Sequence, residues 1–95
     1  MEIQLKQMSK LNILFTHHAV ADYQYWQEQD KKMLKRVNEL INSIQRDGAL
    51  EGIGEPEKLK GNLSGFYSRR IDTEHRLVYK VSEQQLSIIA CRYHY

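Results

Sequence analysis

The sequence predicts an α+β domain with one strand, two helices and then an antiparallel β-meander, with both helices on one face of the sheet. Three observations carry this prediction. A short apolar run comes first, a stripe of apolar residues at helical spacing follows, and the end of the chain alternates between apolar and polar residues. With 95 residues, 41% of them hydrophobic, the chain is long enough for one domain with a small core.

The first half of the chain supplies the first strand and both helices. Residues 11–15 are largely apolar and suit a buried strand, and Thr16 offers an N-cap for a helix that begins near His17 or His18. Asp30 ends this helix and caps the next one. The second helix has apolar residues at i, i+3, i+4 and i+7, so one side of it is expected to pack on the core. These residues are Met33, Leu34, Val37, Leu40, Ile41 and Ile44.

The second half supplies the meander. Gly48 ends the second helix, and residues 50–57, which contain glycines and the only proline, form a loop. Three strands follow over residues 66–71, 76–81 and 86–93. A period of two divides the last strand into one face with Leu86, Ile88, Ala90, Arg92 and His94, and another with Ile89, Cys91, Tyr93 and Tyr95.

Residues 1–10 have no clear period, and we expect them to form a leader before a single domain over residues 11–95. The leader lacks the apolar segment of a secretion signal, and the chain has no run of the ~18 apolar residues that span a bilayer. We therefore expect the protein in the cytoplasm. Cys91 is the one cysteine, which excludes an internal disulfide and a zinc site built on several thiolates.

The positive charge lies toward the end of the chain. The net charge is +2, but residues 1–57 hold seven Lys or Arg against nine Asp or Glu, whereas residues 58–95 hold seven against three. A basic segment that also contains aromatic residues favours phosphate groups and bases. A solvated sheet face with ordinary surface lysines explains the charge equally well.

Polar residues in this basic segment suit RNA cleavage without a metal. Such cleavage needs a base for the 2′-hydroxyl, cations for the phosphorane and an acid for the leaving 5′-oxygen. Glu57, on a loop, is a candidate base, and His94 is a candidate acid. Arg70 and Arg76 offer planar guanidinium groups to the phosphate. The candidates for base stacking are Tyr67, Tyr93 and Tyr95.

Other interpretations of these residues remain open. A loop carboxylate such as Glu57 and a terminal histidine such as His94 are often simply solvated. Cys91 is more typical of a small core residue than of a nucleophile. A metal site made by His17, His18 and Cys91 is disfavoured, because adjacent histidine side chains point apart. We expect no metal and no cofactor.

Several segments of the chain form a specific pattern. The most specific are NLSGFYSRRI at residues 62–71 and CRYHY at residues 91–95. Further segments are YWQE at 25–28, NELI at 38–41, GEPEKLK at 54–60 and EHRLVY at 74–79. From about Leu11 to Tyr95 the chain resembles the YoeB toxins, a branch of the RelE/ParE superfamily of bacterial type II toxin–antitoxin systems.

This resemblance implies a RelE/ParE-like microbial RNase fold and a ribosome-dependent mRNA endoribonuclease. Such toxins cut the codon in the ribosomal A site and leave a 2′,3′-cyclic phosphate without a metal. The resemblance makes Glu57 the general base, His94 the general acid and Arg76 the residue that stabilises the phosphate. Supporting contacts fall on Lys60, Arg70 and Tyr95, while Tyr67 keeps an aromatic ring where the family commonly has tryptophan.

The resemblance also implies partners. These are a YefM-like antitoxin, the ribosome with its mRNA, operator DNA bound by the toxin–antitoxin complex, and a second copy of the chain in a homodimer. Two alternative functions are a ParE-like gyrase poison and a catalytically silent corepressor. The joint presence of Glu57, Arg76 and His94 argues against the first, and the sequence does not exclude the second.

Overall fold

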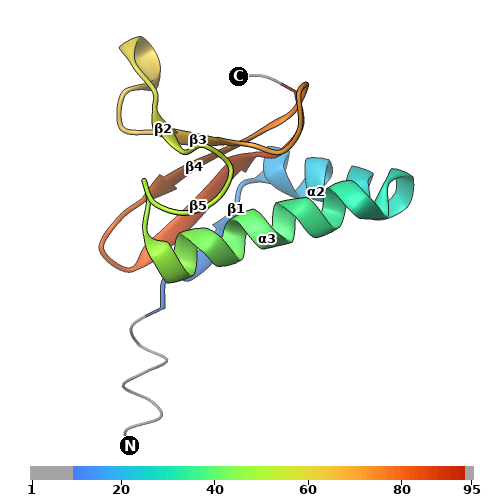
Figure 1. Cartoon of the computed structure of the whole chain (residues 1–95), viewed down its shortest axis with the longest axis horizontal. Coiled ribbons are helices and arrows are strands. Elements are labelled where there is room, and N and C mark those ends of the chain that lie inside the picture. The colour runs from blue at the N-terminus through green and yellow to red at the C-terminus, as the bar shows by residue number, and fades with distance from the viewer. Residues whose placement is uncertain (1–9, 94–95) are drawn as a thin grey trace, which may run out of the picture.

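The computed structural model describes residues 10–93, which fold into a five-stranded sheet with two α-helices on one face (Figure 1). This confirms the predicted α+β class and the order of strand, helices and meander. In this part of the chain the elements are β1 (Asn12–Phe15), α2 (His17–Gln29), α3 (Lys31–Asp47), β2 (Glu57–Lys58), the 3₁₀ turn η1 (Gly61–Leu63), β3 (Tyr67–Arg70), β4 (Arg76–Val81) and β5 (Gln85–Ala90).

Both helices begin where the sequence predicts, because a polar side chain caps each N-terminus. The Thr16 hydroxyl accepts the backbone N–H of Ala19 at 3.1 Å at the start of α2. The Asp30 carboxylate accepts the N–H groups of Lys32 and Met33 at the start of α3, at 3.0 and 3.3 Å. Each cap stabilises its helix by about 1 kcal/mol, because it satisfies an N–H group that has no partner inside the helix.

The strands lie in the order β1-β5-β4-β3-β2 across the sheet. Strands β2 to β5 form an antiparallel meander, whereas β1 runs parallel to β5. The first and last strands of the domain are therefore neighbours. The Gln45 side chain of α3 also binds both backbone groups of Leu11, at 2.9 and 2.8 Å, which ties the start of β1 to the helix layer.

The core lies between the helices and the sheet. The predicted apolar stripe of α3 is confirmed, because Val37, Leu40 and Ile44 are buried in it, and Met33 and Leu34 pack against its margin. Strands β4 and β5 complete the core with Leu77, Tyr79, Leu86 and Ile88. None of the helices in the described part of the chain is long and apolar enough to cross a membrane.

Glu57 lies in a strand and not in the predicted loop over residues 50–57. Glu57 and Lys58 form β2, which pairs with Ser68 and Tyr67 of β3. A strand of two residues is too short to show a period in the sequence, so only its pairing with β3 in the structure identifies it.

The last strand ends before the predicted residue 93, and it contains a bulge. Tyr79 pairs with Ile88, but Val78, the neighbour of Tyr79, pairs with Ala90. Ile89 is therefore an extra residue in β5. Such a residue shifts the alternation of side chains by one position.

The bulge moves Cys91 from the predicted face into the core. Cys91 is fully buried in the same cluster as Leu86 and Ile88. The predicted faces of Ala90 and Cys91 are therefore wrong, because a period of two assumes an unbroken ladder. The predicted faces of His94 and Tyr95 lie outside the described residues.

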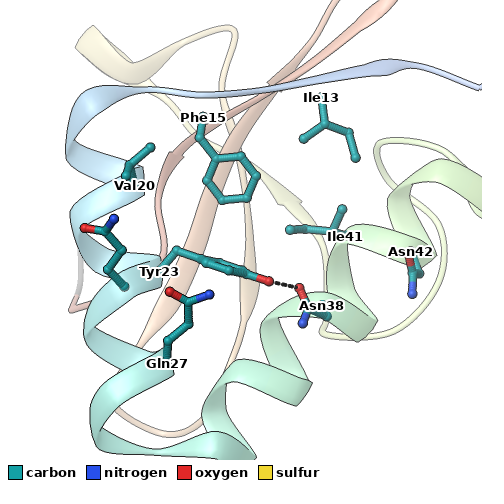
Figure 2. Close-up of a pocket in the computed structure, with 9 residues that line it drawn as sticks. Ile13, Phe15, Val20, Tyr23, Gln27, Asn38, Ile41 and Asn42 are labelled. Atoms are coloured by element: carbon teal, nitrogen blue, oxygen red, sulfur yellow. Dashed lines mark hydrogen bonds between the residues drawn. The ribbon is translucent and has the colours of Figure 1, made fainter.

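A groove runs between β1 and the two helices (Figure 2). It encloses about 620 Å³, and on its wall Phe15 and Tyr23 meet edge to face at 5.3 Å between ring centroids. The Tyr23 hydroxyl donates to the Asn38 side-chain oxygen at 2.8 Å. The residues that line the groove are Ile13, Phe15, Val20, Tyr23, Gln24, Gln27, Asn38, Ile41 and Asn42. None of these side chains is charged.

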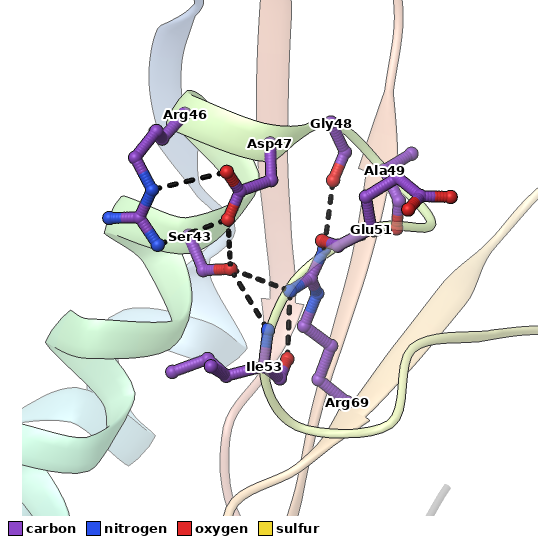
Figure 3. Close-up of polar contacts among 8 residues, drawn as sticks. All are labelled: Ser43, Arg46, Asp47, Gly48, Ala49, Glu51, Ile53 and Arg69. Atoms are coloured by element: carbon purple, nitrogen blue, oxygen red, sulfur yellow. Dashed lines mark hydrogen bonds and ion pairs between the residues drawn. The ribbon is translucent and has the colours of Figure 1, made fainter.

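A buried arginine joins α3, the loop that follows it and two strands (Figure 3). Arg69 of β3 pairs with Leu77 on the core face, and its side chain is fully buried. A buried cation is tolerated only where its donors are satisfied. Its guanidinium donates to Ser43 Oγ (3.0 Å), Tyr79 Oη (2.9 Å) and the carbonyl oxygens of Gly48 (2.8 Å), Glu51 (2.6 Å) and Ile53 (2.8 Å).

The polar groups around Arg69 support one another. Burial raises the pKa of Tyr79, so its hydroxyl keeps the proton that it donates to the Ala49 carbonyl at 2.6 Å. Ser43 donates to the Asp47 carboxylate at 3.1 Å and accepts the N–H of Ile53 at 3.2 Å. The path of the loop from residue 48 to residue 54 is therefore set by side chains of α3, β3 and β4.

Gly52 and Gly48 provide a matched test of this loop. Both have φ of 103°, a value that residues with a side chain rarely adopt, so an alanine is strained at either position. A Cβ at Gly52 would collide with Ser43 Oγ and lie 2.7 Å from Asp47 Oδ2, whereas a Cβ at Gly48 meets no atom within 4 Å. We expect Gly52→Ala to lower the free energy of unfolding by about 1–3 kcal/mol more than Gly48→Ala in urea titrations. Equal losses would contradict the close packing of the loop on Arg69.

Candidate active site

The three strands β2, β3 and β4 bring polar residues to the sheet face that lies away from the helices. Glu57 pairs with Ser68, and Arg70 pairs with Arg76. Direct partners across strands share a face, and residues two apart along a strand do the same. Because Arg69 between them points into the core, Ser68 and Arg70 lie on the open face together with Glu57 and Arg76.

Glu57, Ser68 and Arg76 form a connected cluster on this face. The Arg76 Nη2 lies 3.3 Å from Glu57 Oε1, and Arg76 Nε donates to Ser68 Oγ at 3.1 Å. The Ser68 hydroxyl donates in turn to Glu57 Oε1 at 3.5 Å. Ser68 is fully buried and the Arg76 side chain is 13% exposed, whereas the Glu57 side chain is 52% exposed. The guanidinium is therefore held in place, and the carboxylate beside it is open to solvent.

The other described candidates, Arg70, Lys60 and Tyr67, differ in their surroundings. Arg70 is exposed next to Arg76, and its Nε lies 4.0 Å from Glu55 Oε2. Lys60 is exposed directly before η1. Tyr67 points to the helix side of the sheet, where its ring stacks on Tyr79 with 5.6 Å between centroids. The structure thus brings Arg70 to the cluster but not Tyr67, whose role in substrate binding stays a prediction.

His94 and Tyr95 lie outside the described residues, but the residue before them is bound beside the cluster. The backbone N–H of Tyr93 donates to His75 Nδ1 at 2.7 Å. The Tyr93 carbonyl accepts the backbone N–H of Arg76 at 3.1 Å. The backbone of Tyr93 is thus fixed to two consecutive residues, one of which is the arginine of the cluster.

Side chains of helix α2 bind the same C-terminal segment at Cys91, two residues before Tyr93. The Asp22 carboxylate accepts the N–H of Cys91 at 3.0 Å, and the Trp26 indole N–H donates to the Cys91 carbonyl at 2.7 Å. The Arg92 guanidinium lies over the ring of Tyr25, 3.4 Å from its centroid. Side chains of α2 therefore decide where residues 91 and 92 lie.

Sequence reasoning missed Asp22, His75 and Ser68. Asp22 carried a usable signal, because it lies between Ala19 and Trp26 on the buried side of its helix. A carboxylate on such a side must have a partner. His75 and Ser68 had no comparable signal, since their roles arise from contacts with segments far away in the chain.

Cys91 is a core residue, as the sequence favoured, and not an activated nucleophile. Burial raises the pKa of the Cys91 thiol to about 12, and the Asp22 carboxylate shifts it in the same direction. Among the described residues, no group of three or more His, Cys, Asp or Glu is arranged to hold a metal ion.

Comparison with known families decides the relationship. The model of the YoeB-like toxins of bacterial type II toxin–antitoxin systems matches residues 15–95. This chain belongs to that family. Toxin YoeB of Streptomyces coelicolor is 54% identical over 85 residues, which cover 90% of this chain and 100% of that protein. The resemblance that the motifs indicated is confirmed.

Solved YoeB structures have the same fold. The structure of the YoeB dimer from Staphylococcus aureus superposes with a TM-score of 0.86 at 60% identity, covering 90% of this chain and 99% of that one. The toxin chain in a heterotetrameric YoeB-YefM complex from Staphylococcus aureus gives a TM-score of 0.84 at 60% identity with the same coverage. The predicted RelE/ParE-like fold is therefore confirmed.

The protonated, buried state of Cys91 can be tested by alkylation. At pH 8.5 we expect the native protein to react with iodoacetamide far more slowly than the protein unfolded in urea, because only the thiolate is nucleophilic and the native thiol keeps its proton. Mass spectrometry gives both rates, and the single cysteine makes the product unambiguous. Labelling of native protein at the unfolded rate would contradict the assignment of Cys91 to the core.

Proposed function

We propose that this toxin is a ribosome-dependent endoribonuclease that cuts mRNA in the A site without a metal. One observation carries the proposal. The Glu57 carboxylate and the Arg76 guanidinium lie 3.3 Å apart on the open sheet face, and the backbone of Arg76 also binds Tyr93, the residue before His94. A base, a phosphate ligand and the chain that carries an acid thus meet at one arginine.

In the proposed reaction, Glu57 takes the proton of the 2′-hydroxyl of the RNA. The 2′-oxygen then bonds to phosphorus, and the bond from phosphorus to the 5′-oxygen breaks. His94 gives a proton to this leaving oxygen, which leaves a 2′,3′-cyclic phosphate and a 5′-hydroxyl. Arg76 stabilises the charge that develops on the phosphorane oxygens.

Ser68 gives Arg76 its role in this scheme. The Ser68 hydroxyl accepts a hydrogen bond from Arg76 Nε, which holds the guanidinium on the open face with Nη2 beside Glu57. A fixed cation needs no reorganisation when charge develops on the phosphate. Arg70 on the neighbouring strand adds positive charge to the same face, and the exposed Lys60 before η1 adds a further cation that can attract the RNA backbone.

The proposed partners follow from the family and from this reaction. They are the ribosome and its mRNA, a YefM-like antitoxin, operator DNA in complex with that antitoxin, and a second copy of the chain. The related Staphylococcus aureus toxin was solved both as a dimer and with YefM, which supports two of these proposals. A ribosomal substrate also implies action in the cytoplasm.

Induced expression followed by primer extension on a reporter mRNA tests the proposed function. Cuts in phase with codons support the endoribonuclease. A DNA damage response without cuts would instead favour a gyrase poison, and normal growth would favour a catalytically silent corepressor.

Glu57→Gln tests the base directly. We expect the single-turnover rate of mRNA cleavage on ribosomes to fall about 10²–10⁴-fold, because an amide cannot accept the proton. Glu83→Gln, in the exposed turn between β4 and β5, removes the same charge away from the cluster and is expected to cut at the wild-type rate. A folded Glu57→Gln protein with full activity would remove Glu57 from this role.

His94→Gln tests the acid in the same assay. We expect a rate loss of about 10²–10⁴-fold with an unchanged melting temperature, because the described contacts that hold this segment use residues 91–93. His17→Gln, at the exposed start of α2, is the matched control and is expected to have no effect. Undiminished cleavage by His94→Gln would move the acid to another residue.

A further inference from the structure

Three side chains bind the backbone of the C-terminal segment, and we call them the tail cradle: Asp22, Trp26 and His75. Asp22 and Trp26 bind the two backbone groups of Cys91, and His75 binds the N–H of Tyr93. All three are buried, with exposed fractions of 6%, 5% and 8%. Buried hydrogen bonds of this kind are costly to leave unmade.

The ring of His75 is fixed from several sides. It meets the Trp26 ring edge to face, with 4.9 Å between centroids and an angle of 82°. Its backbone N–H donates to the Asp72 carboxylate at 2.7 Å, and its carbonyl accepts the N–H of Ile71 at 2.9 Å. The Glu74 carboxylate lies 3.6 Å from Nε2. The position of Nδ1 is therefore set by the turn before β4 and by α2 together.

The bond from Tyr93 defines the chemistry of this ring. A backbone N–H can only donate, so His75 Nδ1 must present its lone pair, and the ring proton is assigned to Nε2. The nitrogen acts as an acceptor at 2.7 Å from the amide nitrogen.

Tyr93 also has a strained backbone, with φ of 65°. A residue with a side chain is strained in this left-handed conformation and keeps it only where the surrounding contacts hold it there. Two hydrogen bonds hold Tyr93 in this conformation, one from its N–H to His75 and one from the Arg76 N–H to its carbonyl. Without the acceptor at His75, the lower energy of an extended backbone would redirect the chain that follows.

We propose that His75 is a positioning residue of the active site, whose Nδ1 fixes the backbone amide of Tyr93, the residue that precedes the proposed acid His94. This inference rests on the proposed function, in which His94 is the acid. His75 touches neither substrate nor reacting atoms in this role. Since a displacement of ~1 Å can reduce a rate ~10²-fold, a loose tail lowers the rate of the chemical step.

Three substitutions separate the acceptor from the packing of the ring. His75→Asn places its carbonyl oxygen where Nδ1 lies, so it keeps an acceptor for Tyr93. His75→Gln places its polar atoms one bond further out, near the position of Nε2, and His75→Phe keeps a ring against Trp26 but has no acceptor. We expect kcat to fall about 10²-fold in the Gln and Phe variants, with KM unchanged, and to recover largely in the Asn variant.

Hydrogen exchange of the Tyr93 amide, followed by NMR on the full chain, gives a readout that does not depend on cleavage. We expect the amide to be protected in the wild type and in His75→Asn, and to exchange rapidly in His75→Gln and His75→Phe. Equal protection in all four proteins would overturn the proposal, as would wild-type kcat in His75→Phe. If that variant does not fold, the comparison of Asn with Gln decides.

The two readouts also separate this inference from the function on which it rests. A wild-type protein that cuts no RNA would refute the proposed endoribonuclease, and it would equally remove the catalytic meaning of the cradle. In that case the amide exchange still decides whether His75 holds the tail. Cleavage in the wild type with no loss in either the Gln or the Phe variant would refute only the role of His75.

Discussion

The hydrogen-bond network of the buried Arg69 guanidinium is the interaction on which the rest of the structure depends. Its hydrogen bonds reach α3 through Ser43, β4 through Tyr79 and the loop between α3 and β2 through carbonyl groups. The same loop is tied to β3 by the bond from the Arg70 N–H to the Gly54 carbonyl at 2.7 Å. Glu57 follows this loop in the chain. The buried Arg69, which fixes the loop, therefore also positions Glu57 at the start of β2.

Neighbouring residues in and beside β3 and β4 place their side chains on opposite faces of the sheet. Arg69 points into the core and Arg70 to the open face, and His75 faces α2 while Arg76 faces the cluster. Arg70 and Arg76 on the open face thus each follow a residue that anchors the fold. This division explains why the β3–β4 hairpin carries both the buried Arg69 and the Arg70 and Arg76 side chains of the candidate site.

The sequence was sufficient wherever a signal is local. The caps at Thr16 and Asp30 and the stripe of α3 depend on residues a few positions apart, and all three were predicted correctly. It failed where pairing between distant strands decides. The two-residue strand at Glu57 and the bulge at Ile89 exist only because of their partners, and the bulge reversed the face of Cys91. For the candidate site, the residue types and the family motifs pointed to Glu57, Arg70 and Arg76. They gave no indication of the buried Ser68 and His75 that hold neighbouring groups in place.

The tail cradle makes the candidate site a property of the whole domain. Asp22 and Trp26 lie 69 and 65 positions from Cys91, so their bonds need α2 packed on the sheet, whereas the bond between Tyr93 and His75, 18 positions apart, forms within the β4–β5 pair. Side chains of this segment make contacts too, because Cys91 is buried in the core, Arg92 lies over the ring of Tyr25, and the Tyr93 ring lies 5.6 Å from the ring of His75. A chain that has lost the packing of α2 thus loses the bonds that fix the backbone of Cys91 and the contact that places Arg92.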